Sequence, residues 1–286
     1  MQKPTSMVCP SCGNLISTEE TQCPICGAKH PNLFGLGPYI NKVFGNQIDI
    51  LSLIPTACIA LYVLSLVLDL GSALNVQGGM HGILSPGVVP QILFGMTSGG
   101  PIATAGPYEF GGGWHTTITA IYLHGSLLHI FFNFMWIRQL GPEVGNLYGP
   151  ARYFIIFTAG GVLGFVLSNL WPGVPTLGAS GAIFGLLAAL IVYGRSRGGA
   201  TAEMMTRQIW QWAILMFLMG FMLPSVNNVA HFGGFVGGWI ASQVLVGGAA
   251  YQETRSVTLF ALGLLVLTAG SFALSIWKNW PILFIG

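Results

Sequence analysis

The sequence predicts an all-α protein that crosses a membrane several times and is preceded by a small cysteine-bearing module. Three observations predict this class. The chain of 286 residues is 53% hydrophobic and only 6% charged, against the roughly 25% charged residues of soluble domains. Apolar segments of helical length recur along it, and two Cys-x-x-Cys pairs lie in its polar first segment. The formal net charge of +2 provides no clustered basic surface, which excludes nucleic-acid binding.

Residues 1–30 are expected to fold around a metal ion. Two C-x-x-C-G turns supply four thiolates that can close a tetrahedron around structural zinc: Cys9, Cys12, Cys23 and Cys26. A disulfide pair is disfavoured in a reducing cytosol, and a redox-active pair would not need a second copy. So short a segment buries little apolar surface, and the metal would therefore supply most of its folding energy. This module resembles a zinc ribbon, and the sequence does not reveal its partner.

A linker over residues 31–50, with scattered Pro, Gly and Asn, leads into a transmembrane domain over residues 51–286. Seven apolar segments in this domain approach the length of about 20 residues that a bilayer core requires. They cover residues 51–70, 119–140, 153–171, 181–193, 209–223, 229–247 and 257–277. The connection over residues 71–113 is unusually long, which is typical of functional loops. Within it, residues 88–96 are apolar enough for a short helix at the membrane interface.

Basic residues predict the orientation, because Lys and Arg stay on the cytosolic side of short loops. The polar first segment is no cleavable leader, so the N-terminus is expected in the cytosol. Nine of the ten basic residues then fall inside and Lys278 falls outside; the nine are Lys3, Lys29, Lys42, Arg138, Arg152, Arg195, Arg197, Arg207 and Arg255. Seven spans place the C-terminus at the exterior. We expect a multi-pass protein of the cell (plasma) membrane.

A serine and a histidine stand at corresponding ends of two glycine-striped segments. Ser180 and His231 each precede a pair of glycines at i, i+4 spacing: Gly181 with Gly185, and Gly234 with Gly238. Small residues at this spacing let two helix backbones touch, which would bring the serine oxygen within hydrogen-bond reach of the imidazole. Serine beside histidine is the pairing of acyl-transfer catalysis. The alternative is that these small residues serve helix packing alone.

Ser180 is expected to lie inside the membrane. Fourteen residues separate it from Arg195, which must reach the cytosolic interface. At about 1.5 Å per residue the serine lies about 21 Å from that interface, and roughly 10 Å below the outer surface of the hydrocarbon core. Non-helical backbone at this depth must be buried in protein or line a hydrated cavity. Residues 172–179, with two prolines and two glycines, are therefore expected to line a cavity open to the outside.

Two further polar residues share one face of a predicted helix. His129 and Asn133 are four residues apart, and both side chains can donate hydrogen bonds to a developing oxyanion. The backbone N–H of Ser180 is a third candidate donor. The alternative is that His129 and Asn133 only bond to neighbouring helices.

Carboxylates near the membrane segments are limited to Asp69 and Glu143, each at a predicted helix end, where burial is least unfavourable. A Ser-His dyad is therefore expected rather than a triad, and it would depend on the oxyanion donors. Asn227 and Asn228 are candidates for orienting the imidazole. Three other histidines are interpreted as loop or interface residues: His81, His115 and His124.

Together these residues resemble the rhomboid family of intramembrane serine proteases. The resemblance covers residues 51–286 and rests on three motifs: His129-Ile-Phe-Phe-Asn133, Gly178-Ala-Ser180-Gly181, and Ala230-His231-Phe-Gly-Gly234 with Gly238. It implies that Ser180 is the nucleophile and His231 the general base. It also implies that His129 and Asn133 form the oxyanion hole.

The same resemblance implies a six-helix core followed by a seventh transmembrane helix, as in the family's extended form. It further implies that Glu143 is a buried structural glutamate and that Phe184 packs on His231. One departure concerns the long first loop, where the family typically carries Trp-Arg and this chain has Trp114-His115. The docking of that loop is therefore open at this point.

The function that the sequence favours is proteolysis of other proteins' transmembrane segments near their outer ends, with the substrate entering from the lipid bilayer past the fifth helix. A second hypothesis is a catalytically silent relative that binds transmembrane helices. A third is a transporter, which would call for internal pseudo-repeats that this sequence lacks. Zinc is expected only in the N-terminal module, and catalysis is expected to need no cofactor.

Overall fold

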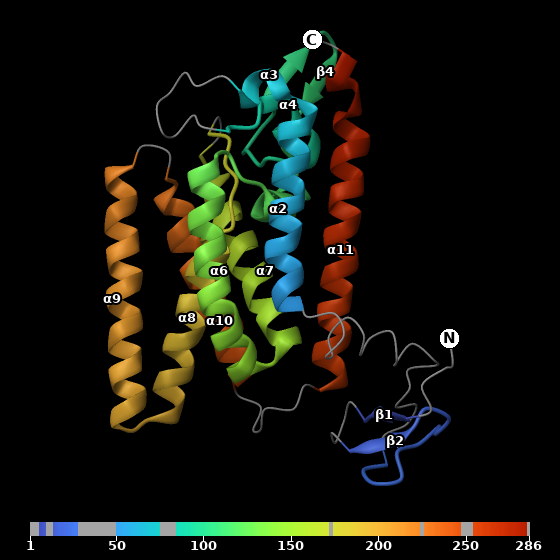
Figure 1. Cartoon of the computed structure of the whole chain (residues 1–286), viewed down its shortest axis with the longest axis vertical. Coiled ribbons are helices and arrows are strands. Elements are labelled where there is room, and N and C mark those ends of the chain that lie inside the picture. Colours follow the sequence, from blue (N-terminus) through green and yellow to red (C-terminus); the bar gives the residue numbers. More distant parts are fainter. Residues whose placement is uncertain are drawn as a thin grey trace.

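The computed structural model describes residues 6–9, 14–27, 50–74, 84–171, 174–223, 226–246 and 254–284. Figure 1 shows a bundle of long helices. Among the described residues seven helices reach 18 residues or more: α2 (Ile50–Leu68), α6 (Leu127–Tyr148), α7 (Pro150–Ser168), α8 (Ser180–Arg197), α9 (Ala200–Met222), α10 (Asn228–Val246) and α11 (Arg255–Asn279). The predicted all-α class is confirmed, with one long helix at each predicted apolar segment.

Three stretches of the described chain are long and apolar enough to span a bilayer: α2, α7 and the segment Arg255–Phe284 that contains α11. Residues Thr116–Tyr122 and Leu127–Tyr148 would provide a fourth if they act as one bent span. Helices α8, α9 and α10 are not among these stretches, and their membrane crossing stays a prediction. With the composition, these helices indicate a multi-pass membrane protein.

The segment predicted as one helix over residues 119–140 is broken, and that prediction was wrong. A short buried piece, α5 (Thr116–Thr119) with η3 (Ala120–Tyr122), is bent by 90° from α6, which begins at Leu127. Ser126 has an extended backbone, and its hydroxyl accepts a hydrogen bond from the His129 N–H at 3.3 Å. This serine is the N-cap of α6. Hydropathy alone does not identify such a cap, because it does not distinguish a capping serine from a serine inside a helix.

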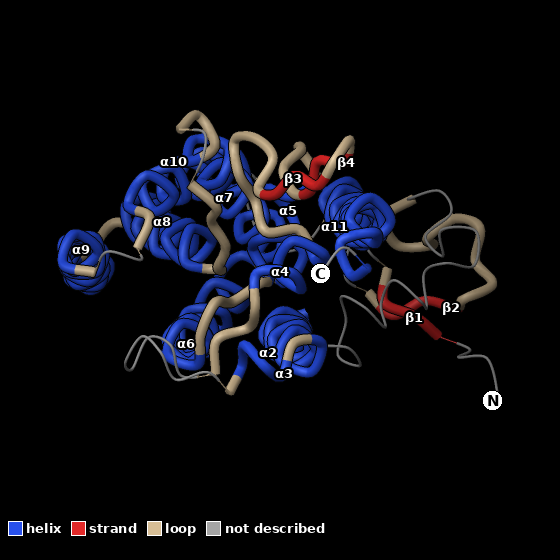
Figure 2. Tube along the Cα trace, turned by 90° about the horizontal axis from the view of Figure 1, so that it is seen from above, coloured by secondary structure: helices blue, strands red, loops and turns tan. Residues whose placement is uncertain are grey.

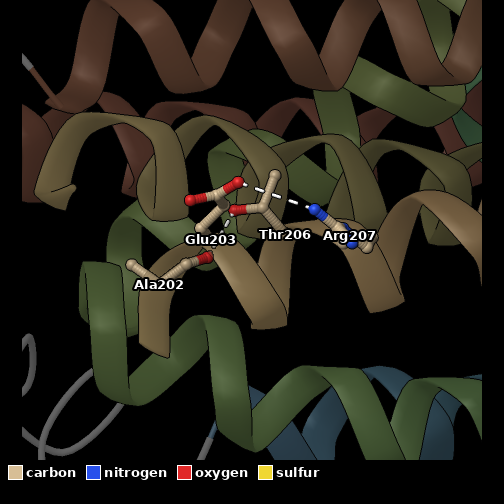
Figure 3. Close-up of polar contacts among 4 residues, drawn as sticks. All are labelled: Ala202, Glu203, Thr206 and Arg207. Atoms are coloured by element: carbon tan, nitrogen blue, oxygen red, sulfur yellow. Dashed lines mark hydrogen bonds and ion pairs between the residues drawn. The ribbon is translucent and has the colours of Figure 1, made fainter. Parts of the chain in front are cut away.

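Helix α9 begins at Ala200 rather than at the predicted residue 209. The prediction followed apolar residues only, and the first turns of this helix are polar. Figure 3 shows these turns, where Arg207 lies 3.6 Å from Glu203 and the Thr206 hydroxyl donates to the Ala202 carbonyl at 2.8 Å. Both charged side chains are 75% exposed. The helix lies at the edge of the bundle in both Figure 1 and Figure 2. Glu203 is thus a helix carboxylate that the sequence interpretation did not count.

Described parts of the long connection between α2 and α6 pack against α11. It contains α3 (Leu70–Ala73), α4 (Val88–Phe94) and a hairpin of β3 (Ala103–Ala105) with β4 (Tyr108–Phe110). The predicted short helix is confirmed as α4, and its apolar end is buried in protein. The Ser275 hydroxyl donates to the Leu93 carbonyl at 3.1 Å, and Asn279 Oδ1 accepts from the Gly111 N–H at 2.9 Å. The seventh long helix therefore holds this connection in place (Figure 2).

Helices α7, α8 and α10 pack backbone against backbone. A Cβ added at Gly234 would lie 2.1 Å from the Gly181 oxygen, and one at Gly238 would lie 2.2 Å from the Gly185 Cα. The predicted contact of the two glycine stripes is thereby confirmed. Helix α7 joins them through Gly164, where a Cβ would lie 2.5 Å from the Ala230 oxygen. The role of the α7 glycines was not foreseen from the sequence.

Candidate active site

The glycine contact brings a serine and a histidine from two helices together. Ser180 is the first residue of α8, and His231 lies in the first turn of α10. The distance between Ser180 Oγ and His231 Nε2 is 2.8 Å, which is a hydrogen bond. Ser180 is partly accessible, whereas His231 is buried, with 7% of its surface exposed. The pair therefore combines an accessible hydroxyl with a largely desolvated imidazole.

The ring of His231 is positioned by an aromatic stack. Phe184 lies one turn after Ser180 on α8, and its ring is stacked on the imidazole with centroids 4.5 Å apart and planes 21° apart. The predicted packing of Phe184 on His231 is confirmed. The second ring nitrogen, Nδ1, has no hydrogen-bond partner in the described part of the chain. Among the described residues, neither a carboxylate nor an amide bonds to the ring at this nitrogen.

His129 faces the loop that leads into Ser180. Gly178 in this loop has φ +125°, and a Cβ built on it would lie 2.6 Å from His129 Nε2. Only glycine combines this backbone conformation with room for the ring. The Gly125 N–H lies 3.4 Å from Nδ1 and can donate only to an unprotonated nitrogen. The neutral imidazole therefore carries its proton on Nε2, the nitrogen beside the Ser180 loop.

Asn133 lies one turn further along α6 and is 5% exposed. Its Nδ2 donates one hydrogen bond to the His129 carbonyl at 2.8 Å, as expected for positions four residues apart on one helix face. That bond uses one of the two amide hydrogens. Two donors, His129 Nε2–H and the remaining amide hydrogen of Asn133, thus come from successive turns of α6.

The loop before Ser180 is held by an adjacent segment of the long connection. Thr97 and Thr176 exchange two backbone hydrogen bonds of 3.0 and 2.8 Å, and the Gly178 N–H donates to the Ala120 carbonyl at 2.9 Å. The predicted non-helical character of this loop is confirmed for residues 174–179. Ser180 therefore sits at the end of a backbone-paired loop and at the start of a helix.

Residues 111–248 match the family model of the rhomboid domain. This part of the chain is therefore similar to a rhomboid domain. Rhomboid protease GluP of Bacillus subtilis is 33% identical over 134 residues, which are 47% of this chain and 26% of that protein. Rhomboid-type serine protease 2 of Emericella nidulans is 30% identical over 131 residues, 44% of this chain and 25% of the relative. Inactive RHOMBOID-like protein 8 of Arabidopsis thaliana is 29% identical over 126 residues, 42% and 34% respectively.

The matched region includes α6, α8 and the described part of α10, the helices that carry His129, Asn133, Ser180 and His231. The chain spans between 25% and 34% of the length of the three relatives named above. Two of them are named as proteases and one as inactive. Similarity to this family is therefore compatible with an active and with a silent site.

The expectation that Glu143 is buried was wrong. Glu143 is exposed, as is Pro142 beside it. The last turns of α6 instead turn their small residues inward: a Cβ at Gly145 would lie 2.8 Å from Leu51 of α2, and one at Gly141 would lie 3.3 Å from the Tyr153 hydroxyl. With these glycines facing the neighbouring helices, the position at 143 faces outward.

The two asparagines before His231 do not orient its ring, which corrects the sequence interpretation. The Asn227 side chain bonds to the Ala230 N–H, the Ser168 hydroxyl and the Thr176 hydroxyl. The Oδ1 of Asn228 is buried without a hydrogen-bond partner among the described residues. Asn227 is thus the N-cap of α10 and makes further contacts. Its position directly before the helix was the sequence signal for the cap.

The remaining histidines are more buried than expected. His124 is 2% exposed, and its ring lies edge-on to that of His129 with centroids 5.1 Å apart. His115 is also 2% exposed, while the neighbouring Trp114 is 62% exposed. Both histidines lie in loops as predicted, but neither is at the surface. His81 lies outside the described residues.

Three of the four predicted metal ligands lie together at the N-terminal hairpin of β1 (Ser6–Val8) and β2 (Leu15–Ser17). Sulfur atoms of Cys9, Cys23 and Cys26 all lie within 4.8 Å of one another, and Cys9 Sγ is 3.8 Å from Cys26 Sγ. A tetrahedral zinc with Zn–S bonds of about 2.3 Å places its sulfurs about 3.8 Å apart, so these residues fit a metal ion. Cys12 lies outside the described residues.

The local backbone favours thiolate at this cluster. A hydrogen bond from the backbone of Cys26 lowers the pKa of the Cys23 thiol below its ordinary value. Gly27 has φ +74°, and its N–H donates to the Cys23 carbonyl at 2.9 Å. Gly27, which follows the second C-x-x-C, thus allows a tight turn, as expected of a metal-binding knuckle.

Proposed function

We propose that this chain is an intramembrane serine protease that cleaves transmembrane segments of other membrane proteins by a Ser-His dyad. The observation that carries the proposal is the 2.8 Å hydrogen bond between Ser180 Oγ and His231 Nε2. A serine hydroxyl becomes a useful nucleophile only when an adjacent base takes its proton. The match to the rhomboid domain supports the same reaction class.

In the proposed reaction Ser180 Oγ attacks the scissile carbonyl carbon while His231 Nε2 takes the hydroxyl proton. The carbonyl oxygen becomes an oxyanion, which the Ser180 N–H, His129 Nε2–H and the Asn133 amide stabilise. The carbon–nitrogen bond then breaks, and His231 returns its proton to the leaving amine. Water, activated by the same imidazole, hydrolyses the acyl-enzyme ester and restores the hydroxyl. The stack with Phe184 keeps the imidazole in one plane throughout.

The proposed substrate is a single transmembrane helix that unwinds near its outer end. A hydrogen-bonded helix shields its carbonyls, so local unwinding must precede attack. Lateral entry past α9 is supported by the position of this helix at the edge of the bundle (Figures 1 and 2). The proposed topology has a cytosolic N-terminus, an exterior C-terminus and seven spans in the plasma membrane. Reporter fusions at each loop test this orientation.

The test is cleavage of a purified reporter with one transmembrane segment in lipid vesicles. Ser180→Ala and His231→Ala are expected to reduce cleavage to background, a loss of at least about 10³-fold. Ser196→Ala is the matched control, because this serine is exposed at the other end of the same helix and bonds only to the Tyr193 carbonyl in the described chain. Undiminished cleavage by either dyad variant would overturn the assignment.

A catalytically silent protein that binds transmembrane helices is the second candidate, and the relative named as inactive favours keeping it. A fluorophosphonate probe separates the two, because only an activated serine reacts with it. Labelling of wild type that is lost in Ser180→Ala supports the protease. Absence of labelling in correctly folded wild type supports the silent alternative.

We also propose that residues 1–30 form a zinc ribbon, residues 31–50 a linker and residues 51–286 the catalytic domain. The three clustered cysteines support the first of these units, with Cys12 as the fourth ligand. Zinc would there hold the hairpin folded, and catalysis would use no metal. A zinc content of about one ion per chain, lost on substitution of these cysteines, is the expected result.

A further inference from the structure

Asn227 directly precedes α10 and uses its side chain in three hydrogen bonds. Its Oδ1 accepts from the Ala230 N–H at 3.0 Å, which caps the helix. Its Nδ2 donates to Ser168 Oγ at 2.6 Å and to Thr176 Oγ1 at 3.1 Å. Because a backbone N–H can only donate, Oδ1 must face Ala230 and the NH₂ group must face the two hydroxyls.

The partners of Asn227 belong to the elements that carry the dyad. Thr176 lies four residues before Ser180, and Asn227 lies four residues before His231. Ser168 ends α7, the helix that packs against both α8 and α10 through its glycines. One amide group therefore joins the serine loop, the histidine helix and the helix between them.

The glycine contact alone does not determine how the serine loop meets α10. Backbone contact at Gly181 and Gly234 limits how far apart the two helices lie, but the loop before Ser180 is not part of either helix. On its other side this loop is paired with Thr97 and Ala120 through backbone hydrogen bonds. The hydrogen bond from Asn227 to Thr176 links this loop to the start of α10 through side chains.

We propose that Asn227 is a positioning residue that sets the orientation of Ser180 Oγ toward His231 Nε2 by tying the serine loop to the histidine helix. This role rests on the proposed proteolysis by the dyad. Asn227 touches neither the imidazole nor the nucleophile, so it acts through the backbone of both elements. Loss of the tie leaves both catalytic groups present but less often in the reactive arrangement.

Two substitutions separate the tie from the helix cap. Asn227→Ser keeps a good N-cap but is too short to reach Ser168 and Thr176. Thr176→Val keeps the β-branched shape and the backbone pairing with Thr97 but removes the hydroxyl. Each is expected to lower the rate of fluorophosphonate labelling and kcat about tenfold, with KM changed less than about twofold. The double variant is expected to match the stronger single variant, because both changes remove the same link.

The control is Thr254→Ala, which removes the N-cap of α11, where the hydroxyl accepts from the Val257 N–H at 3.4 Å. This change tests cap loss alone and is expected to lower thermal stability without changing the labelling rate per folded molecule. The positioning role is refuted if Asn227→Ser behaves like this control, or if the effects of Asn227→Ser and Thr176→Val multiply. Wild type that is not labelled at all would instead refute the proposed protease function, and the positioning role with it.

Discussion

Gly234→Ala is the substitution that tests most directly how the dyad is assembled. The added Cβ would lie 2.1 Å from the Gly181 oxygen and 2.7 Å from its Cα, whereas ordinary contacts begin at 3.4 Å. These are backbone atoms and cannot rotate away. Helices α8 and α10 must therefore separate by about 1 Å, which is the difference between 2.1 and 3.4 Å rounded down for partial relaxation.

This displacement falls on the dyad, because Gly181 follows Ser180 directly and Gly234 lies one turn after His231. Moving 2.8 Å partners apart by about 1 Å breaks their hydrogen bond. A misplacement of this size costs about 10²-fold in rate, so kcat/KM is expected to fall by about that factor. Overpacking costs about 1–3 kcal/mol, which exceeds the helix-propensity gain of about 1 kcal/mol for Gly to Ala.

The assay is cleavage of the reporter together with thermal unfolding in the same lipid. Gly263→Ala is the matched control, because a Cβ at this α11 position meets nothing within 4 Å. That variant is expected to keep full activity and to gain about 0.5–1 kcal/mol in unfolding free energy. Equal activity and stability for Gly234→Ala and Gly263→Ala would refute the backbone-contact reasoning.

Three further predictions follow from the same coordinates. Asn133→Ala is expected to lower kcat by about 10²–10³-fold with KM nearly unchanged in steady-state kinetics, and a change confined to KM would contradict an oxyanion role. Chelation of the proposed zinc ion is expected to unfold the hairpin around Cys9 and Cys23 while the helical circular dichroism stays constant; a hairpin that keeps its amide protection after treatment with the chelator would show that no metal supports it. Arg207→Ala is expected to change the unfolding free energy by less than about 0.5 kcal/mol, because both side chains of its pair with Glu203, drawn in Figure 3, are 75% exposed; a larger loss in thermal unfolding would contradict this.

Much of the candidate site followed from residue spacing. Glycines at i, i+4 after Ser180 and His231 identify two helix faces that can touch, and helix geometry then brings the side chains at their ends together. The same periodicity places His129 and Asn133 on one face of α6. These are local properties of helices, so a sequence displays them directly.

What the sequence could not display depends on contacts between distant segments. At the end of α6, contacts with Leu51 and Tyr153 of other helices determine which face points inward. The sequence around Glu143 therefore does not show that this side chain points outward. Two of the three side-chain hydrogen bonds of Asn227 go to Ser168 and Thr176, which lie more than fifty residues before it. The break before α6 was hidden because hydropathy does not distinguish the N-cap Ser126 from a polar residue inside a helix.

The contact among α7, α8 and α10 has a consequence for how the protein tolerates its surroundings. Spacing that is determined by main-chain atoms does not depend on rotamers, which fluctuate rapidly at exposed positions. We therefore expect changes in lipid chain length, or in side chains at the periphery, to alter the position of α9 long before they alter the distance between Ser180 and His231. In the proposed protease, the catalytic geometry and the entry route would thus respond independently to the membrane.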